Sequence, residues 1–484
     1  MEHRALSRLA VPAVAALLAL TTGCTGGTVQ GRPGASGLRD PYFPKAGNGG
    51  YQVDHYALDL DYDPPPASGG GTPTSGQLNA TAVITARAEQ GLSSFNLDLS
   101  GLKVEGVTVQ GEPARHNRTG NELTVRPAED LKKGEVFRVE VDYGGKPKAL
   151  VDADSSKEGW IVTKGGPDGG GAVAVGEPIG SMAWFPGNHH PSDKATYDIT
   201  LTVPHGYEAL SNGELRSRTD TGDGRTEFAW HSPEPMASYL ATAVVGPYKV
   251  TTGKTASGVS VYNAVAPGEE AGSAGTLARL PEMVEWGSGR FGPYPFTTAG
   301  AIVLPKGSLT YALETQTRPV FPGAPQEEEL VLHELAHQWF GNSVSPKSWK
   351  DMWLNEGFAT YAEWLWAEDH GGAGAQKHFE AFLAGDTDVD EAADSDWDAF
   401  PPADPPGPEH ISGNPVYYRG AMVLHRIRQE VGDAKFFDLV RGWAADHRHG
   451  NASTAEFTAY AEERTGHDLK KVWDVWLYGQ DRPR

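Results

Sequence analysis

The sequence is poor in cysteine and in positive charge. Cys24 is the only cysteine among 484 residues, which excludes a disulfide within the chain and a catalytic thiol further along it. Lysine and arginine number 41 against 63 aspartates and glutamates, giving a formal net charge of −22. Because this charge opposes nonspecific binding to nucleic acid and to anionic lipid, we expect no nucleic-acid partner.

The N-terminus carries one short apolar run, from Leu9 to Leu20, after Arg4 and Arg8. The run is too short to span a bilayer as a mature helix and is typical of a secretory signal peptide. The stretch Leu20-Thr21-Thr22-Gly23-Cys24 resembles the lipobox of bacterial lipoproteins, with Thr where Leu is usual.

These features predict export. We expect a signal peptide over residues 1–24 and a lipid on Cys24 that anchors the protein at the outer face of the cell membrane. A plain secreted protein with an incidental Cys24 is the alternative. Residues 25–44, rich in Gly and Pro, are predicted to form a flexible tether.

Two segments with different hydrophobic periods follow. Between Tyr51 and Tyr248 apolar residues alternate with polar ones, as at Leu58 and Leu60, and Gly, Pro and Asp clusters interrupt them. Beyond about Pro281 the spacing becomes helical, and a capping box starts at Ser453. The predicted helices cover residues 327–340, 353–369, 421–431 and 469–478.

The expected fold is therefore α+β and multidomain. An N-terminal antiparallel β-sandwich-like domain is predicted over residues 45–253, and a mostly helical domain over residues 254–484. The Gly-rich segment 164–171 lacks a following Lys-Ser/Thr and is interpreted as a loop, and the acidic, Pro-rich segment 386–408 as a long connection.

The sequence His333-Glu334-Leu335-Ala336-His337 is an H-E-x-x-H motif in a predicted helix. Residues four apart share one helix face, so both imidazoles can bind one metal ion while Glu334 accepts a proton from a metal-activated water. The metzincin variant needs Gly and His at the positions of Phe340 and Ser343, so a different third ligand is required.

Glu356 is the candidate for that third ligand. It lies 19 residues beyond His337, near the start of the next predicted helix. Two imidazoles and a carboxylate suit a single Zn²⁺ best, with a fourth position left open, although cobalt or manganese is not excluded.

The segments His333–Asn342 and Trp353–Ala359 together resemble the M1 family of zinc aminopeptidases. The resemblance implies an N-terminal β-domain, a thermolysin-like catalytic domain and removal of N-terminal residues from peptides with a free N-terminus. Many members continue into a helical-repeat domain that covers the active site. This sequence ends at Arg484, so we expect that domain to be absent and the cleft to be more open.

The resemblance also assigns substrate-binding residues. The family's Gly-x-Met-Glu-Asn segment corresponds to Tyr311–Thr315, whose Glu314 would bind the substrate amine. Glu177 stands where a second amine-binding residue, usually Gln, is found. From its position after an apolar run, the segment around Glu314 is predicted to be an exposed edge strand that could align a peptide.

The family's oxyanion-stabilising tyrosine, in a Tyr-x-x-Gly setting, corresponds to Tyr417, with the adjacent Tyr418 as the alternative. A phenol donates a hydrogen bond without carrying charge at neutral pH. The predicted function is a zinc aminopeptidase with Glu334 and Tyr417 as catalytic residues. The alternatives are an endopeptidase of broader scope, a member acting on non-peptide substrates, and a catalytically silent surface-binding lipoprotein. The side-chain preference and the oligomeric state are not predicted.

Overall fold

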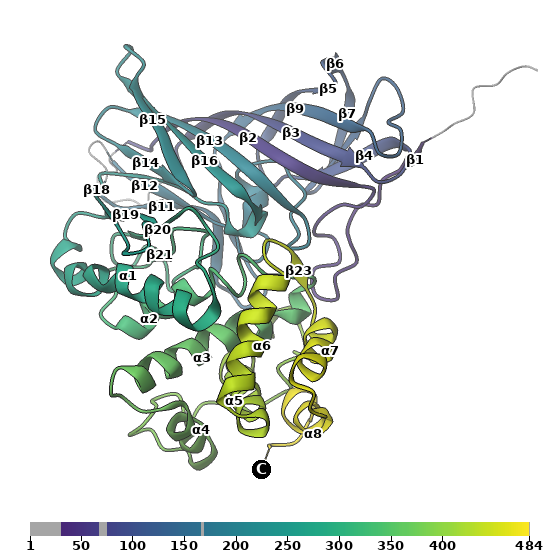
Figure 1. Cartoon of the computed structure of the whole chain (residues 1–484). Coiled ribbons are helices and arrows are strands. Elements are labelled where there is room, and N and C mark those ends of the chain that lie inside the picture. The colour runs from purple at the N-terminus through teal and green to yellow at the C-terminus, as the bar shows by residue number, and fades with distance from the viewer. Residues whose placement is uncertain (1–30, 67–74, 166–168, 484) are drawn as a thin grey trace, which may run out of the picture.

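A computed structural model describes residues 31–66, 75–165 and 169–483. The predicted signal peptide and Cys24 lie outside these residues. Within them, no helix has both the length and the apolar character needed to cross a membrane. Figure 1 shows a strand-rich N-terminal part above a group of helices, with a smaller sheet between them.

The largest sheet has eight strands in the order β15-β16-β13-β2-β3-β9-β5-β6, and all its neighbours pair antiparallel except β2 and β13. The predicted alternation holds in β2, where Leu58 and Leu60 are buried and Asp59 is exposed. The strands are β2 (Tyr51–Asp63), β3 (Gln77–Ala88), β5 (Lys103–Val109), β6 (Glu112–Pro113), β9 (Val136–Gly145), β13 (Lys194–Pro204), β15 (Glu214–Asp220) and β16 (Arg225–Ala237).

Two smaller sheets complete the N-terminal part. The order β1-β4-β8-β7 forms one sheet and β10-β11-β12-β17-β14 the other. The first sheet comprises β1 (Arg32–Pro33), β4 (Leu92–Asp98), β7 (Arg115–Thr119) and β8 (Glu122–Arg126). The second comprises β10 (Ala149–Val151), β11 (Lys157–Thr163), β12 (Gly171–Val175), β14 (Glu208–Ser211) and β17 (Ala243–Gly246).

A four-stranded mixed sheet, in the order β18-β19-β20-β21, leads into the helical part, and helix α1 packs against it. A short parallel pair, β22 with β23, joins two loops of that part. The strands are β18 (Lys249–Lys254), β19 (Ser260–Val265), β20 (Thr298–Val303), β21 (Val320–Phe321), β22 (Ser345–Pro346) and β23 (Asn451–Ala452).

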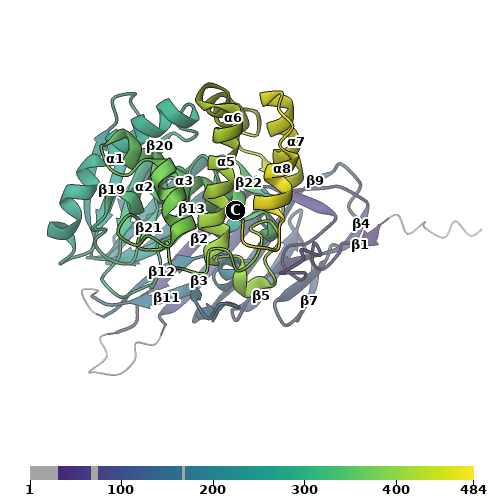
Figure 2. The ribbon, with the colours of Figure 1, turned by 90° about the horizontal axis from the view of Figure 1, so that it is seen from below.

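Helices α2, α3 and α5 lie side by side at the centre of the helical part (Figure 2). Helix α3 is buried on nearly every face, since its aromatic residues contact the surrounding helices. The helices are α1 (Glu270–Phe291), α2 (Glu328–Ala336), α3 (Trp353–Asp369), α4 (Ala375–Ala384), α5 (Gly420–Val431), α6 (Asp433–Asp446), α7 (Thr454–Thr465) and α8 (Lys470–Val472).

Several helix predictions need correction. Helix α1 begins at Glu270, eleven residues before the predicted change of pattern, and it includes Pro281. The predicted helix 327–340 ends at Ala336 because the chain turns back at Gly341, whose φ of 127° favours glycine. The segment predicted as helix 469–478 is the short α8 followed by a π-helical turn. Helices α4 and α6 were not predicted.

Residues 31–44 do not form the flexible tether expected of them. Arg32–Pro33 pairs with β4, and the buried Asp40 carboxylate accepts hydrogen bonds from the Trp349 amide (3.0 Å) and the Ser348 hydroxyl (2.8 Å). This segment therefore ties the N-terminal sheets to the helical part. Composition alone did not show it, because the partners lie about 300 residues away in the sequence.

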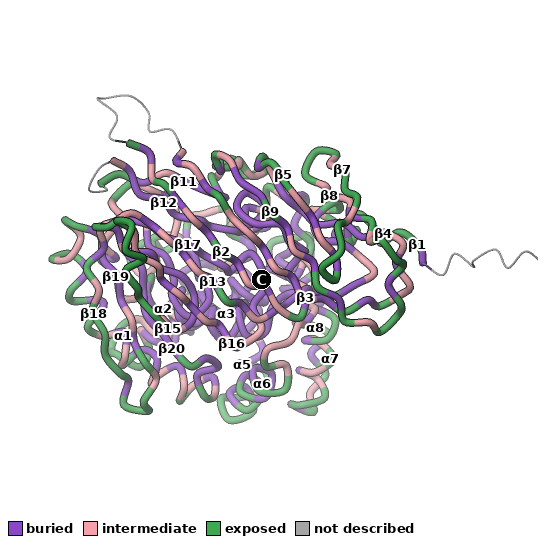
Figure 3. The backbone as a smooth tube through the Cα atoms, turned by 90° about the horizontal axis from the view of Figure 1, so that it is seen from above, coloured by how far each residue is buried: buried purple, intermediate pink, exposed green. Residues whose placement is uncertain are grey.

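The hydrophobic core runs without interruption from the large sheet into the helices. Figure 3 shows buried backbone through the centre of the molecule and exposed backbone mainly at loops and on outer helix surfaces. The predicted capping box is present, since Ser453 accepts a hydrogen bond from the Glu456 amide and Glu456 reaches back to Ser453. This cap fixes the start of α7.

Candidate metal centre

The two histidines of the H-E-x-x-H motif lie on one face at the end of helix α2. Glu356 lies in the first turn of α3, which packs against α2. The Glu356 Oε2 atom is 3.2 Å from His333 Nε2 and 3.3 Å from His337 Nε2. The structure therefore brings all three predicted ligands to one point.

The distances between these atoms fit a tetrahedral zinc site. With metal–ligand bonds of about 2.0–2.1 Å, two ligand atoms of a tetrahedron are about 3.3 Å apart. One ligand atom from each of the three residues lies within 4.8 Å of the others. The donor set and its spacing therefore suit one Zn²⁺ ion.

The other nitrogen of each imidazole is held by the protein. His333 Nδ1 is hydrogen-bonded to Glu363, and His337 Nδ1 is 3.1 Å from the carbonyl oxygen of Phe340. An acceptor at Nδ1 keeps the proton there and leaves the Nε2 lone pair directed at the metal position. Glu363 was not predicted, although it lies seven residues after Glu356, on the same side of α3.

The ionisable groups of the centre shift one another's pKa values. Burial raises the pKa of Glu356, but His337 and His333 outweigh it and bring that pKa down to about 2. Burial raises the pKa of the Glu334 carboxyl to about 8, against the opposing charges of the two histidines. A divalent cation held here would favour ionised Glu334, since it adds positive charge beside a desolvated carboxyl.

A cavity of about 300 Å³ opens over the metal position. Every predicted site residue contributes to its wall. The lining comprises Asp152, Asp154, Ser156, Glu177, Pro178, Thr310, Tyr311, Ala312, Glu314, His333, Glu334, His337, Glu356, Ser412 and Tyr417.

Glu314 is buried at the inner wall of this cavity. Its carbonyl oxygen accepts hydrogen bonds from Asn342 Nδ2 (2.7 Å) and Gln338 Nε2 (3.2 Å). Among the described residues no partner reaches its Oε1 atom. The segment is not the exposed edge strand that the sequence suggested, because only Leu313 pairs, in a single bridge with Val320.

Glu177 approaches the same cavity from the loop after β12. Burial first, and then the charges of Glu314 and Glu356, raise its pKa well above the usual value. In the described part of the chain no hydrogen-bond donor reaches Glu177 Oε1. Two desolvated carboxyl groups, each with a free oxygen, form a site suited to a cationic ligand such as an ammonium group.

The side chains of the two candidate tyrosines, Tyr417 and Tyr418, lie in different environments. The Tyr417 ring stacks on the His333 ring, with centroids 5.9 Å apart, and lines the cavity. The Tyr418 ring stacks on Phe382 at 4.9 Å and is not part of the lining. Both lie in the π-helical turn Pro415–Arg419, which the buried Arg419 anchors by donating to backbone carbonyls near the C-terminus.

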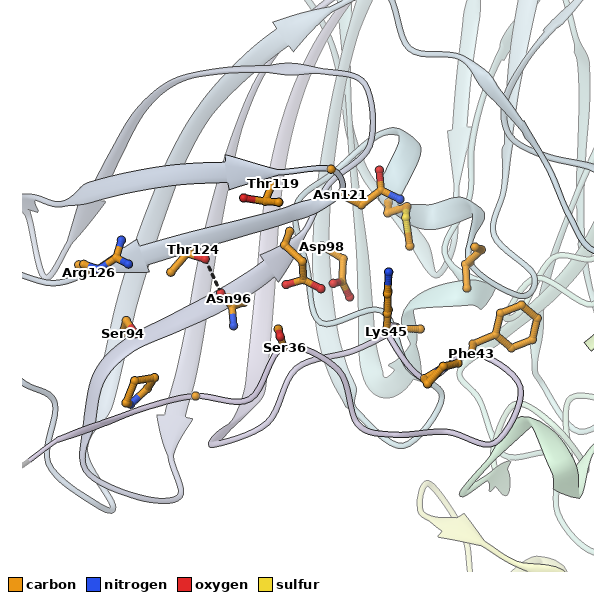
Figure 4. Close-up of a pocket in the computed structure, with 18 of the residues that line it drawn as sticks. Ser36, Phe43, Lys45, Ser94, Asn96, Asp98, Thr119, Asn121, Thr124 and Arg126 are labelled. Atoms are coloured by element: carbon orange, nitrogen blue, oxygen red, sulfur yellow. Dashed lines mark hydrogen bonds between the residues drawn. The ribbon is translucent and has the colours of Figure 1, made fainter.

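A larger cavity, of about 970 Å³, lies elsewhere, between residues 33–46 and strands β4 and β8 (Figure 4). The Thr124 hydroxyl donates to Asn96 Oδ1 at 2.7 Å on its wall. Asp98 accepts from the backbone amides of Gly47 (2.9 Å) and His189 (3.2 Å). None of the predicted site residues is among the described residues that line it, so it is separate from the metal centre.

Two family profiles match the sequence. The peptidase M1 N-terminal domain matches residues 52–240, and the peptidase family M1 domain matches residues 322–476. Among curated proteins, the Tricorn protease-interacting factor F2 of Thermoplasma acidophilum is 25% identical over 80% of this chain and 50% of its own length. Glutamyl aminopeptidase of Bos taurus is 25% identical over 75% of this chain and 41% of its own. The chain thus spans about half the length of these relatives.

Solved structures match over nearly the whole chain. An M1 zinc metallopeptidase from Deinococcus radiodurans is 30% identical with a TM-score of 0.81, covering 93% of this chain and 98% of that one. A mutant of that enzyme bound to a Tyr-Ser-Ala substrate gives a TM-score of 0.82 at 29% identity, covering 93% and 99%. This agreement extends over both the strand-rich part and the helical part.

Proposed function

The chain belongs to peptidase family M1, and from that membership we propose that it is a zinc aminopeptidase that removes the N-terminal residue from peptides. The observation that carries the proposal is the position of Glu314 and Glu177 in the cavity over the metal centre. Their free carboxyl oxygens offer partners for a charged amine. An endopeptidase has no need of such a site, because its substrate has no charged amine next to the cleaved bond.

When bound, a zinc ion supplies Lewis acidity that polarises a carbonyl and makes a nearby water more acidic. Glu314 and Glu177 bind the α-ammonium group and thereby place the first peptide bond at the metal centre. Glu334 accepts the proton of the attacking water and passes it to the leaving amine. The Tyr417 hydroxyl donates a hydrogen bond to the developing oxyanion.

The raised pKa of Tyr417 agrees with its proposed role as a hydrogen-bond donor to the oxyanion. Burial, followed by the charges of Glu356, Glu177 and Glu314, raises the pKa of Tyr417 well above its usual value. The phenol therefore keeps its proton throughout the physiological pH range and remains a hydrogen-bond donor.

The test is release of free amino acids from matched peptides with free and N-acetylated ends, with and without a chelator. We expect cleavage confined to free peptides and abolished by chelation, because acetylation removes the charge that Glu314 and Glu177 bind. Cleavage of both sets would contradict an aminopeptidase and favour an endopeptidase. Stoichiometric zinc binding without cleavage would favour a binding protein.

We also propose that the protein is exported and held at the outer face of the cell membrane by a lipid on Cys24. Arg4, Arg8 and the apolar run before Cys24 support this proposal. Mass spectrometry of the protein from membranes of its native cells is expected to show a lipidated N-terminal Cys24. An unmodified mature protein in the culture medium would contradict the anchor.

A further inference from the structure

We propose that Asp152 and Asp154 make this pocket select substrates whose N-terminal residue has a cationic side chain, lysine or arginine. The inference rests on the proposed aminopeptidase function, because it concerns the side chain of the residue that is released. Neither aspartate takes part in metal binding or in the proton transfer described above.

The two aspartates lie at the tip of the hairpin between β10 and β11, and both line the cavity over the metal centre. The turn holds them in place, since the Asp152 amide donates to the Ser156 carbonyl (3.0 Å) and the Ser156 amide to Asp154 Oδ1 (2.7 Å). Asp152 is half-buried and Asp154 is exposed. The backbone of the turn therefore holds the Asp154 carboxylate, and both aspartates line the cavity from partly or fully exposed positions.

The hairpin is attached to the amine-binding wall. The Tyr311 hydroxyl donates to the Lys157 carbonyl at 2.8 Å, and Tyr311 lies three residues before Glu314. Burial and then the charges of Glu158, Glu177, Asp154 and Asp152 raise the Tyr311 pKa. The charges that act on Tyr417, beside the metal, are instead those of Glu356, Glu177, Glu314 and Glu334. The strand after the hairpin is also tied to the loop of Glu177, since the Ile179 amide donates to Glu158 Oε2 at 3.0 Å. The hairpin therefore borders the part of the cavity that Glu177 and Glu314 form.

These contacts place the aspartates on the amine-binding side of the cavity. In the proposed function the scissile carbonyl is placed at the metal centre and the α-ammonium group at Glu314 and Glu177, so the rest of the peptide extends from the other side of the scissile bond. Only the side chain of the first residue extends past the amine. A lysine or arginine side chain is long enough to carry its charge from the amine site toward Asp152 and Asp154.

The charge of the residues that line the cavity also favours substrates with a cationic N-terminal side chain. Six of its residues are acidic, Asp152, Asp154, Glu177, Glu314, Glu334 and Glu356, and no lysine or arginine is among the described residues that line it. Lys157, which follows the tip, is exposed and is not a lining residue. An acidic N-terminal side chain would meet repulsion from the same carboxylates.

The test compares released residues in pairs of a charged side chain and a neutral counterpart. Lysine is compared with norleucine and arginine with citrulline, in otherwise identical free peptides and with the zinc-loaded full chain. Because a partly exposed ion pair contributes about 2–5-fold, two aspartates predict a kcat/KM ratio of about 4–25-fold for lysine over norleucine. The ratio is expected to fall with rising ionic strength, since salt screens exposed charges.

The variants are Asp154→Asn, Asp152→Asn and the double substitution, with Glu129→Gln, an exposed carboxylate outside the pocket lining, as the control. The double variant is expected to bring the kcat/KM ratios of lysine to norleucine and of arginine to citrulline close to one. The control is expected to keep the ratios of the unmodified protein. A purely structural role would change both members of a pair equally. The exposed Asp154 also provides a variant that does not disturb the core.

Two results would overturn the inference, and each has a different consequence for the proposed function. If free peptides are cleaved but the ratios are near one, or are unchanged in the double variant, only the assignment of a cationic preference to Asp152 and Asp154 is wrong. If no peptide in the set is cleaved by the zinc-loaded protein, the proposed aminopeptidase function fails and this inference fails with it.

Discussion

At the scale of single residues, Glu334 combines its proposed catalytic role with an unusual environment. It is buried beside both histidine ligands, and burial raises its pKa to about 8. It is not one of the three residues whose ligand atoms match a tetrahedral site. Proton transfer and metal binding are therefore assigned to different carboxylates.

Replacing Glu334 by Gln is expected to keep one zinc ion per chain and to lower kcat by at least about 10²-fold, because an amide cannot accept the proton. Metal content is measured by elemental analysis and turnover with a free peptide. Glu327→Gln, an exposed change just before the same helix, serves as the control. Turnover close to that of the unmodified protein would remove Glu334 from its assigned role.

At the scale of elements, the site depends on how closely α3 and α5 approach. Gly357 follows the ligand Glu356 on α3 and lies against Gly420 at the start of α5. A Cβ atom at Gly357 would lie 2.8 Å from the Gly420 carbonyl carbon, closer than real Cβ contacts. The glycine pair thus allows α5, and the turn bearing Tyr417, to pack against the helix that carries the metal ligand.

Gly357→Ala is expected to lower the unfolding free energy by about 1–3 kcal/mol, because backbone atoms must move apart, and to weaken zinc binding through the adjacent Glu356. Thermal unfolding and zinc titration measure the two effects. Gly275→Ala in α1 is the matched control, since its Cβ meets nothing within 4 Å, and a gain of about 0.5–1 kcal/mol is expected there. Equal behaviour of the two variants would contradict the steric argument.

At the scale of the whole molecule, the strand-rich part and the helical part are joined by buried polar contacts as well as by the core. Lys194 on β13 donates to the carbonyls of Ser343 (2.8 Å), Asn342 (2.9 Å) and Gly450 (3.2 Å). Its three ammonium protons match these three acceptors. The carbonyls of Ser343 and Asn342 lie in the turn that follows helix α2, at whose end His333 and His337 lie.

Lys194→Met is expected to destabilise the protein by about 2–3 kcal/mol, because the buried Ser343 carbonyl loses the one donor that the described residues give it, and the Asn342 and Gly450 carbonyls each lose one of two. Urea unfolding measured separately by far-UV circular dichroism and by zinc release is expected to show the loss in both signals. Lys103→Met, at an exposed lysine, is the control and should change the midpoint little. An unchanged midpoint in Lys194→Met would show that the hydrogen bonds of Lys194 do not help to hold the two parts together.

The sequence predicted the fold class and most elements near the site because those signals are local. Alternation in β2, the helical spacing of α3 and the capping box at Ser453 each depend on residues within a few positions. It failed where partners are distant. The segment around Asp40 resembles a tether in composition, while its hydrogen-bond partners Ser348 and Trp349 lie about 300 residues away.

The same difference between local signals and distant contacts is found at the candidate site. The spacing of His333, His337 and Glu356 was enough to choose candidate ligands, since helix periodicity places residues four apart on one face. Spacing could not show that Glu363 supports His333, or that a hairpin about 160 residues before Glu314 brings Asp152 and Asp154 to its cavity. The first contact exists only once α2 has packed against α3, and the second only once the strand-rich part has packed against the helical part.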